Sequence, residues 1–158
     1  YCIMRGTALS EGIGEKLTAL PPMPQCQVLL AKPAISVSTK YVYENLHANS
    51  LKPEQHPDID GMIEAITAGD LLGVSAHLGN VLELVTAKKY PVIEEIKEVM
   101  RRYGAVGAMM SGSGPTVFGL FDNPKAASDA YEELRYGQSR ELAKQVYLTN
   151  IFNNKNIR

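Results

Sequence analysis

The sequence has no tryptophan and only two cysteines among its 158 residues. Cys2 and Cys26 form no Cys-x-x-Cys pair and have no histidine close by, so the sequence predicts neither a disulfide framework nor a structural zinc site. We interpret both as small apolar residues of a protein that works in the reducing cytoplasm.

The chain also lacks an excess of either charge, because 16 lysines and arginines oppose 17 aspartates and glutamates, for a net charge of -1. Nucleic-acid-binding domains usually carry a basic stripe, and helices that lie on membranes are basic and amphipathic. Residues 104–121 carry no charge, but the turn from Gly112 to Pro115 divides them, and a membrane span needs ~20 apolar residues. We therefore expect neither a nucleic-acid nor a membrane partner.

A hydrophobic content of 45% is that of a globular domain, and its periodicity separates strands from helices. Short apolar runs predict strands at 27–31, 105–110, 116–121 and 145–150. Helical spacing predicts helices at 39–46, 59–68, 71–87 with a break near Gly79, 92–103, and after Pro124. Ser38 and Asn123 are the expected N-caps, and Gly69 and Gly104 the expected left-handed stops.

From Gln27 onward this order is βαββαβ, which is typical of an α+β, ferredoxin-like split domain with extra helices. The expected sheet has four antiparallel strands, with the helices on one face. Residues 1–26 are expected to be extended, with a stiff connector from Leu20 to Pro24. The chain opens without methionine or a signal-peptide pattern, so we expect a fragment of a longer protein.

The segment from Ser111 to Thr116 is the strongest candidate for chemistry, because its two glycines allow consecutive N–H groups to converge on an anion. The alternative is a tight turn between two strands, which the spacing alone favours. The segment has no lysine and precedes a strand, so it is not a Walker A loop.

Other polar groups give weaker signals. Tyr43 and Tyr41 lie on the short helix at 39–46, where an exposed ring can stack on a base, although ordinary packing is the default. His56 and Asp58 can form an oriented pair, although a solvated loop is the better interpretation. The stretch from Glu11 to Glu15 is typical of a turn. On residues alone, the chain is an α+β domain with a Gly/Ser loop.

The Gly/Ser loop also carries a resemblance, since residues 109–121 (MMSGSGPTVFGLF) are similar to the third motif of the GHMP kinases. Three further stretches resemble one family within that superfamily, the 4-diphosphocytidyl-2-C-methyl-D-erythritol kinases. They are Gly6–Glu15, Ala31–Thr39, and Asn80–Glu83 followed by Tyr90 and Pro91. The resemblance runs from Tyr1 to about Asn150.

The resemblance implies part of a two-domain transferase of non-mevalonate isoprenoid biosynthesis. Such an enzyme uses Mg²⁺ to move the γ-phosphoryl group of ATP onto the 2-hydroxyl of its cytidine-diphosphate-linked substrate. The family's ATP loop, catalytic lysine and catalytic aspartate belong to the N-terminal half. We therefore expect no catalytic residue, metal ligand or tightly bound cofactor in this chain, and no activity from it alone.

The same resemblance assigns residues 1–26 to strands and a connector of the N-terminal domain, and 27–158 to the C-terminal domain. It matches Tyr43 to an aromatic that stacks on the substrate's cytosine. It matches Ser111, Gly112, Ser113, Gly114 and Thr116 to a loop beside the phosphates. Asn80 and Glu83 match a family pattern, but the sequence gives them no chemical role.

Loss of the N-terminal domain would expose the face that it covers. We expect an apolar patch near 1–9 and around 111–115, able to drive self-association. Two alternatives remain. One is a stand-alone ferredoxin-like module that binds a small ligand. The other is another GHMP kinase, acting on homoserine or mevalonate, against which Tyr43 and the segment from Glu11 to Glu15 argue.

Overall fold

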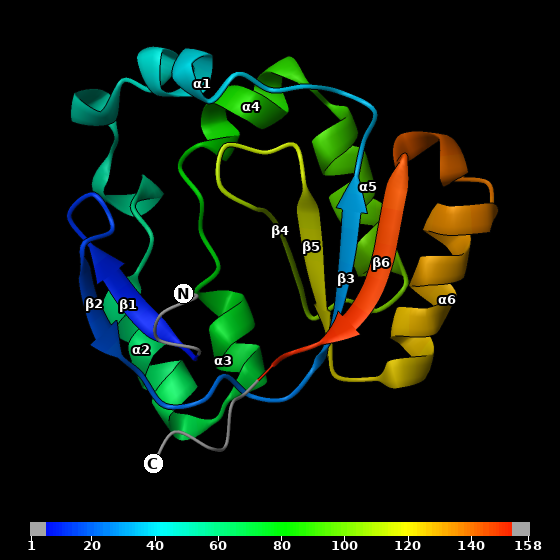
Figure 1. Ribbon diagram of the computed structural model, residues 1–158, viewed down its shortest axis with the longest axis horizontal. Coiled ribbons are helices and arrows are strands. Elements are labelled where there is room, and N and C mark those ends of the chain that lie inside the picture. The colour runs from blue at the N-terminus through cyan, green and yellow to red at the C-terminus, as the bar shows by residue number, and fades with distance from the viewer. Residues whose placement is uncertain (1–5, 153–158) are drawn as a thin grey trace.

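The computed structural model describes residues 6–152, which contain two antiparallel sheets (Figure 1). β1 (Ala8–Glu11) and β2 (Lys16–Ala19) form a hairpin. The larger sheet has the order β4-β5-β3-β6. Its strands are β3 (Gln27–Lys32), β4 (Gly107–Met110), β5 (Val117–Phe121) and β6 (Gln145–Asn150). With helices between β3 and β4 and between β5 and β6, this is the predicted ferredoxin-like βαββαβ arrangement.

Within residues 6–152, six α-helices and three short 3₁₀ turns accompany the sheets. The helices are α1 (Thr39–Asn45), α2 (Ile59–Ala68), α3 (Leu71–Ala76), α4 (Glu83–Lys89), α5 (Val92–Arg102) and α6 (Pro124–Tyr136). The 3₁₀ turns are η1 (Ala48–Ser50), η2 (Pro53–Gln55) and η3 (Arg140–Leu142). η1 and η2 lie in the segment between α1 and α2.

Four helix ends follow from local chemistry as predicted. The Ser38 hydroxyl accepts a hydrogen bond from the Tyr41 N–H at 3.2 Å, and the Asn123 side chain accepts two from the first turn of α6. Gly69 ends α2 with φ 68° and Gly104 follows α5 with φ 95°. Both values lie in the left-handed region, which residues other than glycine disfavour.

The expectation that helices cover one face of the sheet was wrong. On one face, Leu29, Val117 and Phe121 are fully buried against α5 and α6. On the other, Val28 and Leu120 pack with residues of α2 and α3, including Ile66 and Val74. The physical reason is that the four central residues of β3, Val28 to Ala31, and all residues of β5 are apolar, so both faces need cover.

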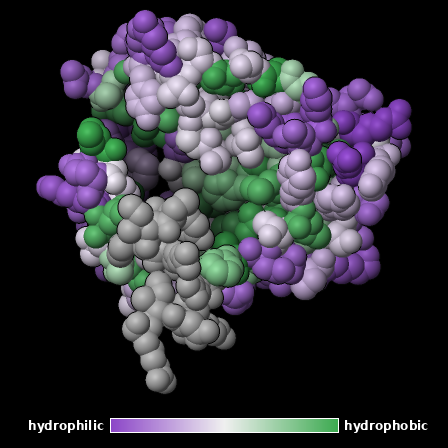
Figure 2. All heavy atoms as spheres, in the orientation of Figure 1, coloured by the Kyte–Doolittle hydropathy of each residue, from purple (hydrophilic) through white to green (hydrophobic). Residues whose placement is uncertain are grey.

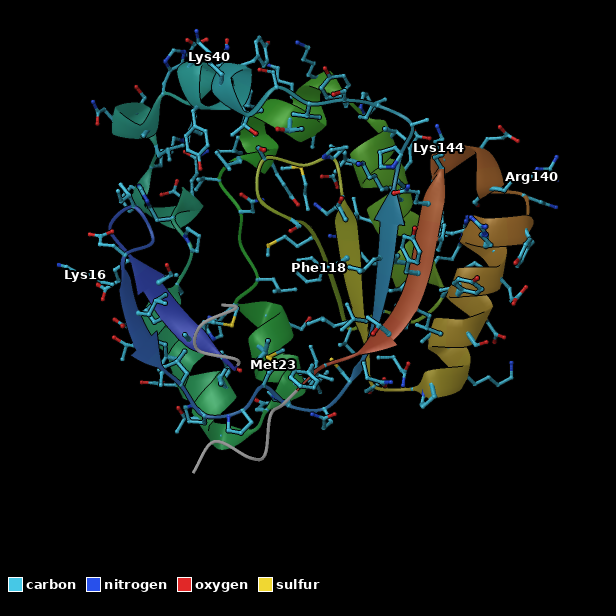
Figure 3. All side chains as sticks on the ribbon, in the orientation of Figure 1. Lys16, Met23, Lys40, Phe118, Arg140 and Lys144 are labelled. Carbon is cyan, nitrogen blue, oxygen red and sulfur yellow. The ribbon has the colours of Figure 1, made fainter. Side chains whose placement is uncertain are left out.

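The face toward α2 and α3 is the less completely covered one. Figure 3 shows Phe118 directed from β5 toward the space between the sheet and that helical side. Figure 2 shows apolar residues gathered in a hollow in the same region. Phe118 is accordingly only half-buried, whereas Phe121 on the opposite face is fully buried.

The predicted helix at 71–87 is two helices, as its expected break indicated. α3 ends at Ala76, and the chain turns before α4 begins at Glu83. This turn brings Asn80 beside the loop between β4 and β5, so the interruption positions a side chain at the candidate site.

Candidate functional site

The Gly/Ser loop from Ser111 to Thr116 joins β4 to β5 as a closed turn. The Ser111 N–H donates to the Thr116 carbonyl at 2.8 Å, and the Gly114 N–H donates to the Ser111 carbonyl at 3.0 Å. Gly112 and Gly114 have φ values of 56° and 84°. The glycines therefore occupy the left-handed region that the turn requires.

Two consecutive backbone donors of this loop remain free. Within residues 6–152, neither the Gly112 N–H nor the Ser113 N–H donates a hydrogen bond. Adjacent N–H groups of this kind bind anions, and the nearby hydroxyls of Ser111 and Thr116 add further donors. The loop has no ionisable side chain, so it can bind and orient an anion but cannot act as a general base.

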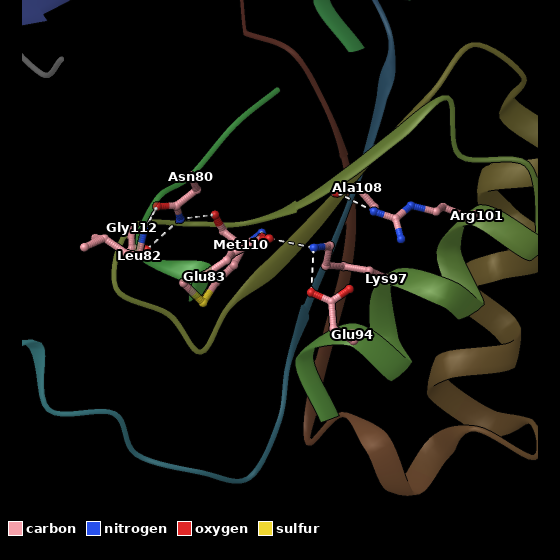
Figure 4. A network of polar contacts seen from close by, with 9 residues as sticks. All are labelled: Asn80, Leu82, Glu83, Glu94, Lys97, Arg101, Ala108, Met110 and Gly112. Atoms are coloured by element: carbon pink, nitrogen blue, oxygen red, sulfur yellow. Dashed lines mark hydrogen bonds and ion pairs between the residues drawn. The ribbon is translucent and has the colours of Figure 1, made fainter. Parts of the chain in front are cut away.

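Side chains from the turn before α4 and from α4 itself hold the loop (Figure 4). The Asn80 side-chain amide donates to the carbonyls of Met110 at 2.9 Å and Gly112 at 2.8 Å. Its oxygen accepts from the Leu82 N–H at 3.0 Å, which fixes the orientation of the amide. Thr86, only 1% exposed, donates its hydroxyl to the Ser113 carbonyl at 3.2 Å.

Below the loop lies a buried ion network that ties α4 to α5. One oxygen of Glu83 accepts from the Met110 N–H, and the other lies 2.6 Å from the Lys97 ammonium. Lys97 also contacts Glu94 at 2.8 Å and is 5% exposed. A buried ammonium needs such partners, since an unpaired charge in the interior is costly.

Helix α1 meets the same loop from another side. The hydroxyls of Thr39 and Ser113 lie 2.9 Å apart. Tyr43, on this helix, is 61% exposed, and within the described residues its ring has neither an aromatic nor a cation–π partner. The ring of Tyr41, in contrast, lies beneath the Lys89 ammonium at 3.6 Å. Of the two tyrosines, Tyr43 therefore has the free face.

The histidines do not join this site. Asp58 contacts His77 at 3.2 Å rather than His56, and Asp58 also caps α2 by accepting from the Gly61 N–H. The preferred interpretation of a solvated loop fits His56, which is exposed, and the weaker possibility of a His56–Asp58 pair is not seen, because the folded chain brings α3 beside the start of α2. Among residues 6–152, no three His, Cys, Asp or Glu side chains form a group that could hold a metal ion.

The remaining predictions have mixed outcomes. Glu11 to Glu15 forms the turn between β1 and β2, as expected. Cys26 is a free, buried thiol whose pKa is raised by burial, while Cys2 and the tail after Phe152 lie outside the described residues. No helix in the described part of the chain is long and apolar enough to cross a membrane.

The predicted apolar patch is tested only in part. Residues 1–5 lie outside the described range, and Thr7 to Leu9 are half-buried. In the Gly/Ser loop, Ser111 and Gly112 are exposed while Pro115 is buried. The loop surface is therefore polar rather than apolar.

The sequence missed three of the groups that shape the loop. Thr86 and Lys97 were read only as helix residues, and Asn80 had no assigned role. The sequence offered two signals at Asn80, the match to a family pattern and the helix break near Gly79, because an asparagine in a helix interruption frequently bonds to backbone groups. Its partners, 30 and 32 residues away, could not be read from the local pattern.

Comparison with known proteins agrees with the resemblance seen in the sequence. Residues 62–138 match the family model described as GHMP kinases C terminal. The chain is 55% identical over 157 residues to a 4-diphosphocytidyl-2-C-methyl-D-erythritol kinase of Lachnoclostridium phytofermentans, and 56% identical over 152 residues to that of Lachnospira eligens. These matches cover 99% and 96% of this chain, and 52% and 51% of the relatives. The chain thus spans about half the length of these curated relatives.

Solved structures give the same result at the level of the fold. A crystal structure of 4-(cytidine 5'-diphospho)-2C-methyl-D-erythritol kinase aligns with a TM-score of 0.68 at 27% identity, over 90% of this chain and 48% of that one. A homoserine kinase from Cytophaga hutchinsonii aligns with a TM-score of 0.76 at 21% identity, over 95% and 50%, and shows the fold alone. Residues 62–138 are thus identified as a GHMP kinase C-terminal domain, and the chain as a whole is similar to about half of a 4-diphosphocytidyl-2-C-methyl-D-erythritol kinase.

Proposed function

We propose that the chain is the C-terminal part of a kinase that phosphorylates the 2-hydroxyl of 4-diphosphocytidyl-2-C-methyl-D-erythritol, a step of non-mevalonate isoprenoid biosynthesis. The observation that carries this proposal is the 55% identity to such a kinase along 99% of the chain. The γ-phosphoryl group of ATP is transferred, with ADP as the second product. We further propose a cytoplasmic location, in keeping with the free thiol of Cys26.

The loop from Ser111 to Thr116 would lie beside the phosphates of this reaction. Phosphoryl transfer depends mainly on positioning and on stabilising charge, rather than on covalent chemistry by the protein. The free N–H groups of Gly112 and Ser113 are suited to both tasks, because they present fixed positive dipoles to an anion.

Tyr43 would hold the other end of the substrate by stacking on its cytosine. The ring is exposed and unpartnered, and α1 is joined to the loop by the contact between Thr39 and Ser113. Stacking of a base on an aromatic side chain contributes ~1–3 kcal/mol. One structural unit would thus contact both the base and the phosphates.

Magnesium and the proton-transfer groups belong to other parts of the proposed enzyme. The loop offers N–H and hydroxyl donors but no carboxylate, so it fits an anion and does not fit Mg²⁺. We assign residues 27–158 to the C-terminal domain and 1–26 to the edge of the N-terminal domain. That N-terminal half is the partner that we propose for the segment at residues 1–9, and we propose that without it this segment drives self-association, with no contribution from the polar surface of the Gly/Ser loop.

Replacing Tyr43 tests the substrate assignment. In the full-length protein, we expect Tyr43→Ala to raise the KM for the cytidine-linked substrate by roughly 5- to 150-fold, from the stacking energy. Tyr43→Phe keeps the ring and should leave KM near the wild-type value. The measurement is ADP release at varied substrate and fixed, saturating ATP.

Tyr136 provides the matched control, because it is 62% exposed but lies on α6. Tyr136→Ala should not change KM. Wild-type protein that turns over homoserine or mevalonate, and not the cytidine-linked alcohol, would contradict the proposed substrate.

A further inference from the structure

The orientation of the loop's peptide planes decides whether it can bind an anion. In a planar trans peptide, the C=O of one residue and the N–H of the next point in opposite directions. Any group that binds a loop carbonyl therefore also directs the N–H on the other side of the same peptide. The Gly112 and Ser113 N–H groups are the ones that must face outward.

Asn80 directs one of these donors. Its amide binds the Gly112 carbonyl at 2.8 Å on the side of α4, so the Ser113 N–H points away from α4. The second donor is set within the loop, because the Ser111 carbonyl accepts from the Gly114 N–H and thereby turns the Gly112 N–H outward. The same Asn80 amide also binds the Met110 carbonyl at the entrance of the loop.

Thr86 and Glu83 fix peptides that lie after and before the Gly112–Ser113 peptide in the chain. The Thr86 hydroxyl holds the Ser113 carbonyl, and Glu83 holds the Met110 N–H while Lys97 compensates its charge. Without Lys97, a carboxylate would lie uncompensated beneath a loop that is proposed to bind phosphate. All of these groups come from outside the loop and leave its outward donors untouched.

We propose that Asn80 is a positioning residue, which presets the Gly112–Ser113 peptide so that the Ser113 N–H faces the transferring phosphoryl group, with Thr86 supporting the adjoining peptide. This inference rests on the proposed kinase function and adds residues to its site. Neither side chain touches the phosphates. Each acts through the backbone of the loop.

The test uses the full-length protein with ATP and the cytidine-linked substrate. We expect Asn80→Ala to lower kcat by roughly 10- to 100-fold, somewhat less than the ~10²–10³-fold loss seen when a direct donor to a transition-state oxyanion is removed. Asn80→Asp keeps the acceptor for the Leu82 N–H but loses the amide donor, and should lower kcat by a similar factor. The KM of the cytidine-linked substrate should change little.

Asn123→Ala is the matched control for stability. Asn123 also bonds to backbone groups, but it does so at the start of α6. This variant should lower the melting temperature and leave kcat within about twofold, since cap removal affects stability. The inference would be overturned if Asn123→Ala lowered kcat as much as the Asn80 variants do. It would also be overturned if both Asn80 variants kept the wild-type kcat.

Thr86 supplies a second pair of variants that separates hydrogen bonding from packing. Thr86→Val keeps the shape of the side chain but removes the hydroxyl, and should lower kcat. Thr86→Ser keeps the hydroxyl and should retain most of the wild-type kcat. Equal kcat in the two variants would contradict the assigned role. The wild-type assay distinguishes failure of this inference from failure of the proposed function. If the wild-type protein forms no ADP with the cytidine-linked substrate, the proposed function is contradicted, and this inference with it.

Discussion

At the scale of single residues, the two glycines of the loop have different surroundings. A β-carbon on Gly114 would lie 2.5 Å from the Met110 sulfur and 3.3 Å from a Thr86 methyl, whereas one on Gly112 would meet no atom within 4 Å. Met110 is fully buried and has little room to move away. Gly114 is thus required both because a side chain would clash with its neighbours and because its φ is positive, whereas Gly112 is required by its positive φ alone.

Alanine substitutions should separate these two effects. We expect Gly114→Ala to lower the free energy of unfolding by about 2–4 kcal/mol, from left-handed strain and overpacking together. Gly112→Ala should lower it by about 1–2 kcal/mol, from strain alone. Urea denaturation followed by circular dichroism measures both. Equal losses in the two variants would show that the contact with Met110 does not matter.

A carboxylate at the end of α6 gives a residue-scale prediction about pH. The pKa of Glu133 is lowered from 4.5, first by the Ser139 hydroxyl, which donates to it at 2.6 Å, and then by the Ser139 N–H and the Tyr103 hydroxyl. A lowered pKa favours the ionised form in the folded protein, so its contribution is complete above pH 4.5 and is lost as the pH falls through the lowered pKa.

Comparison of Glu133→Gln with wild type tests this sign. The wild type should have the higher melting temperature at pH 7, and the difference should shrink as the pH falls below 4.5. Glu132→Gln, an exposed neighbour, is the control and should show no such change. A difference that stays constant down to pH 3 would contradict the assignment.

At the scale of secondary structure elements, the sequence predicted what local chemistry determines. The N-caps Ser38 and Asn123 and the left-handed glycines 69 and 104 mark helix ends with residues that lie within a turn of the end itself. The contacts that build the site are of another kind, since Asn80 and Thr86 reach a loop about 30 residues away. Such partners depend on how α4 packs against the sheet, which no local pattern encodes.

The ion network between α4 and α5 is the clearest case of such tertiary positioning. Lys97 lies on the apolar face of α5, where sequence periodicity alone would place a hydrophobic residue, and its charge is balanced by Glu83 and Glu94. Removing one member of a buried ion pair leaves the other without compensation, at a cost of roughly 3–5 kcal/mol.

We expect Lys97→Met to reduce the free energy of unfolding by about 3 kcal/mol. Glu83→Gln in the same chain should recover part of that loss, because it removes the uncompensated carboxylate. The double-mutant cycle, measured by urea denaturation, gives the coupling between the two side chains. A coupling near zero would mean that the ion pair does not tie α4 to α5.

At the scale of the whole molecule, residues 6–152 contain a loop with two free N–H groups, to which we assign phosphate binding, and a tyrosine with a free ring face, to which we assign base stacking. The same residues contain no group of side chains that could hold a metal ion. The chain spans about half of its curated relatives. We propose that its contribution to the reaction is positioning. The reactive groups that the resemblance implies belong to the other half.

The isolated 158-residue chain should accordingly form no ADP from ATP and the cytidine-linked substrate above a no-protein control. Binding and orientation alone do not supply the proton transfer that the acceptor hydroxyl requires. Full-length protein assayed in parallel is the positive control. Turnover by the isolated chain that is retained after repurification would show that it contains a catalytic base of its own.

The central position of β3 has a consequence for how the molecule is made. β3 is synthesised first among the four strands of its sheet, yet its two neighbours, β5 and β6, come from near the end of the chain. As the polypeptide leaves the ribosome, both edges of β3 stay open until residue 121 has emerged, and the edge that pairs with β6 stays open until residue 150 has emerged. Pairing over such sequence separations is slow, and open strand edges promote aggregation. Chaperone protection of the nascent chain is therefore most needed between the synthesis of β3 and that of β6.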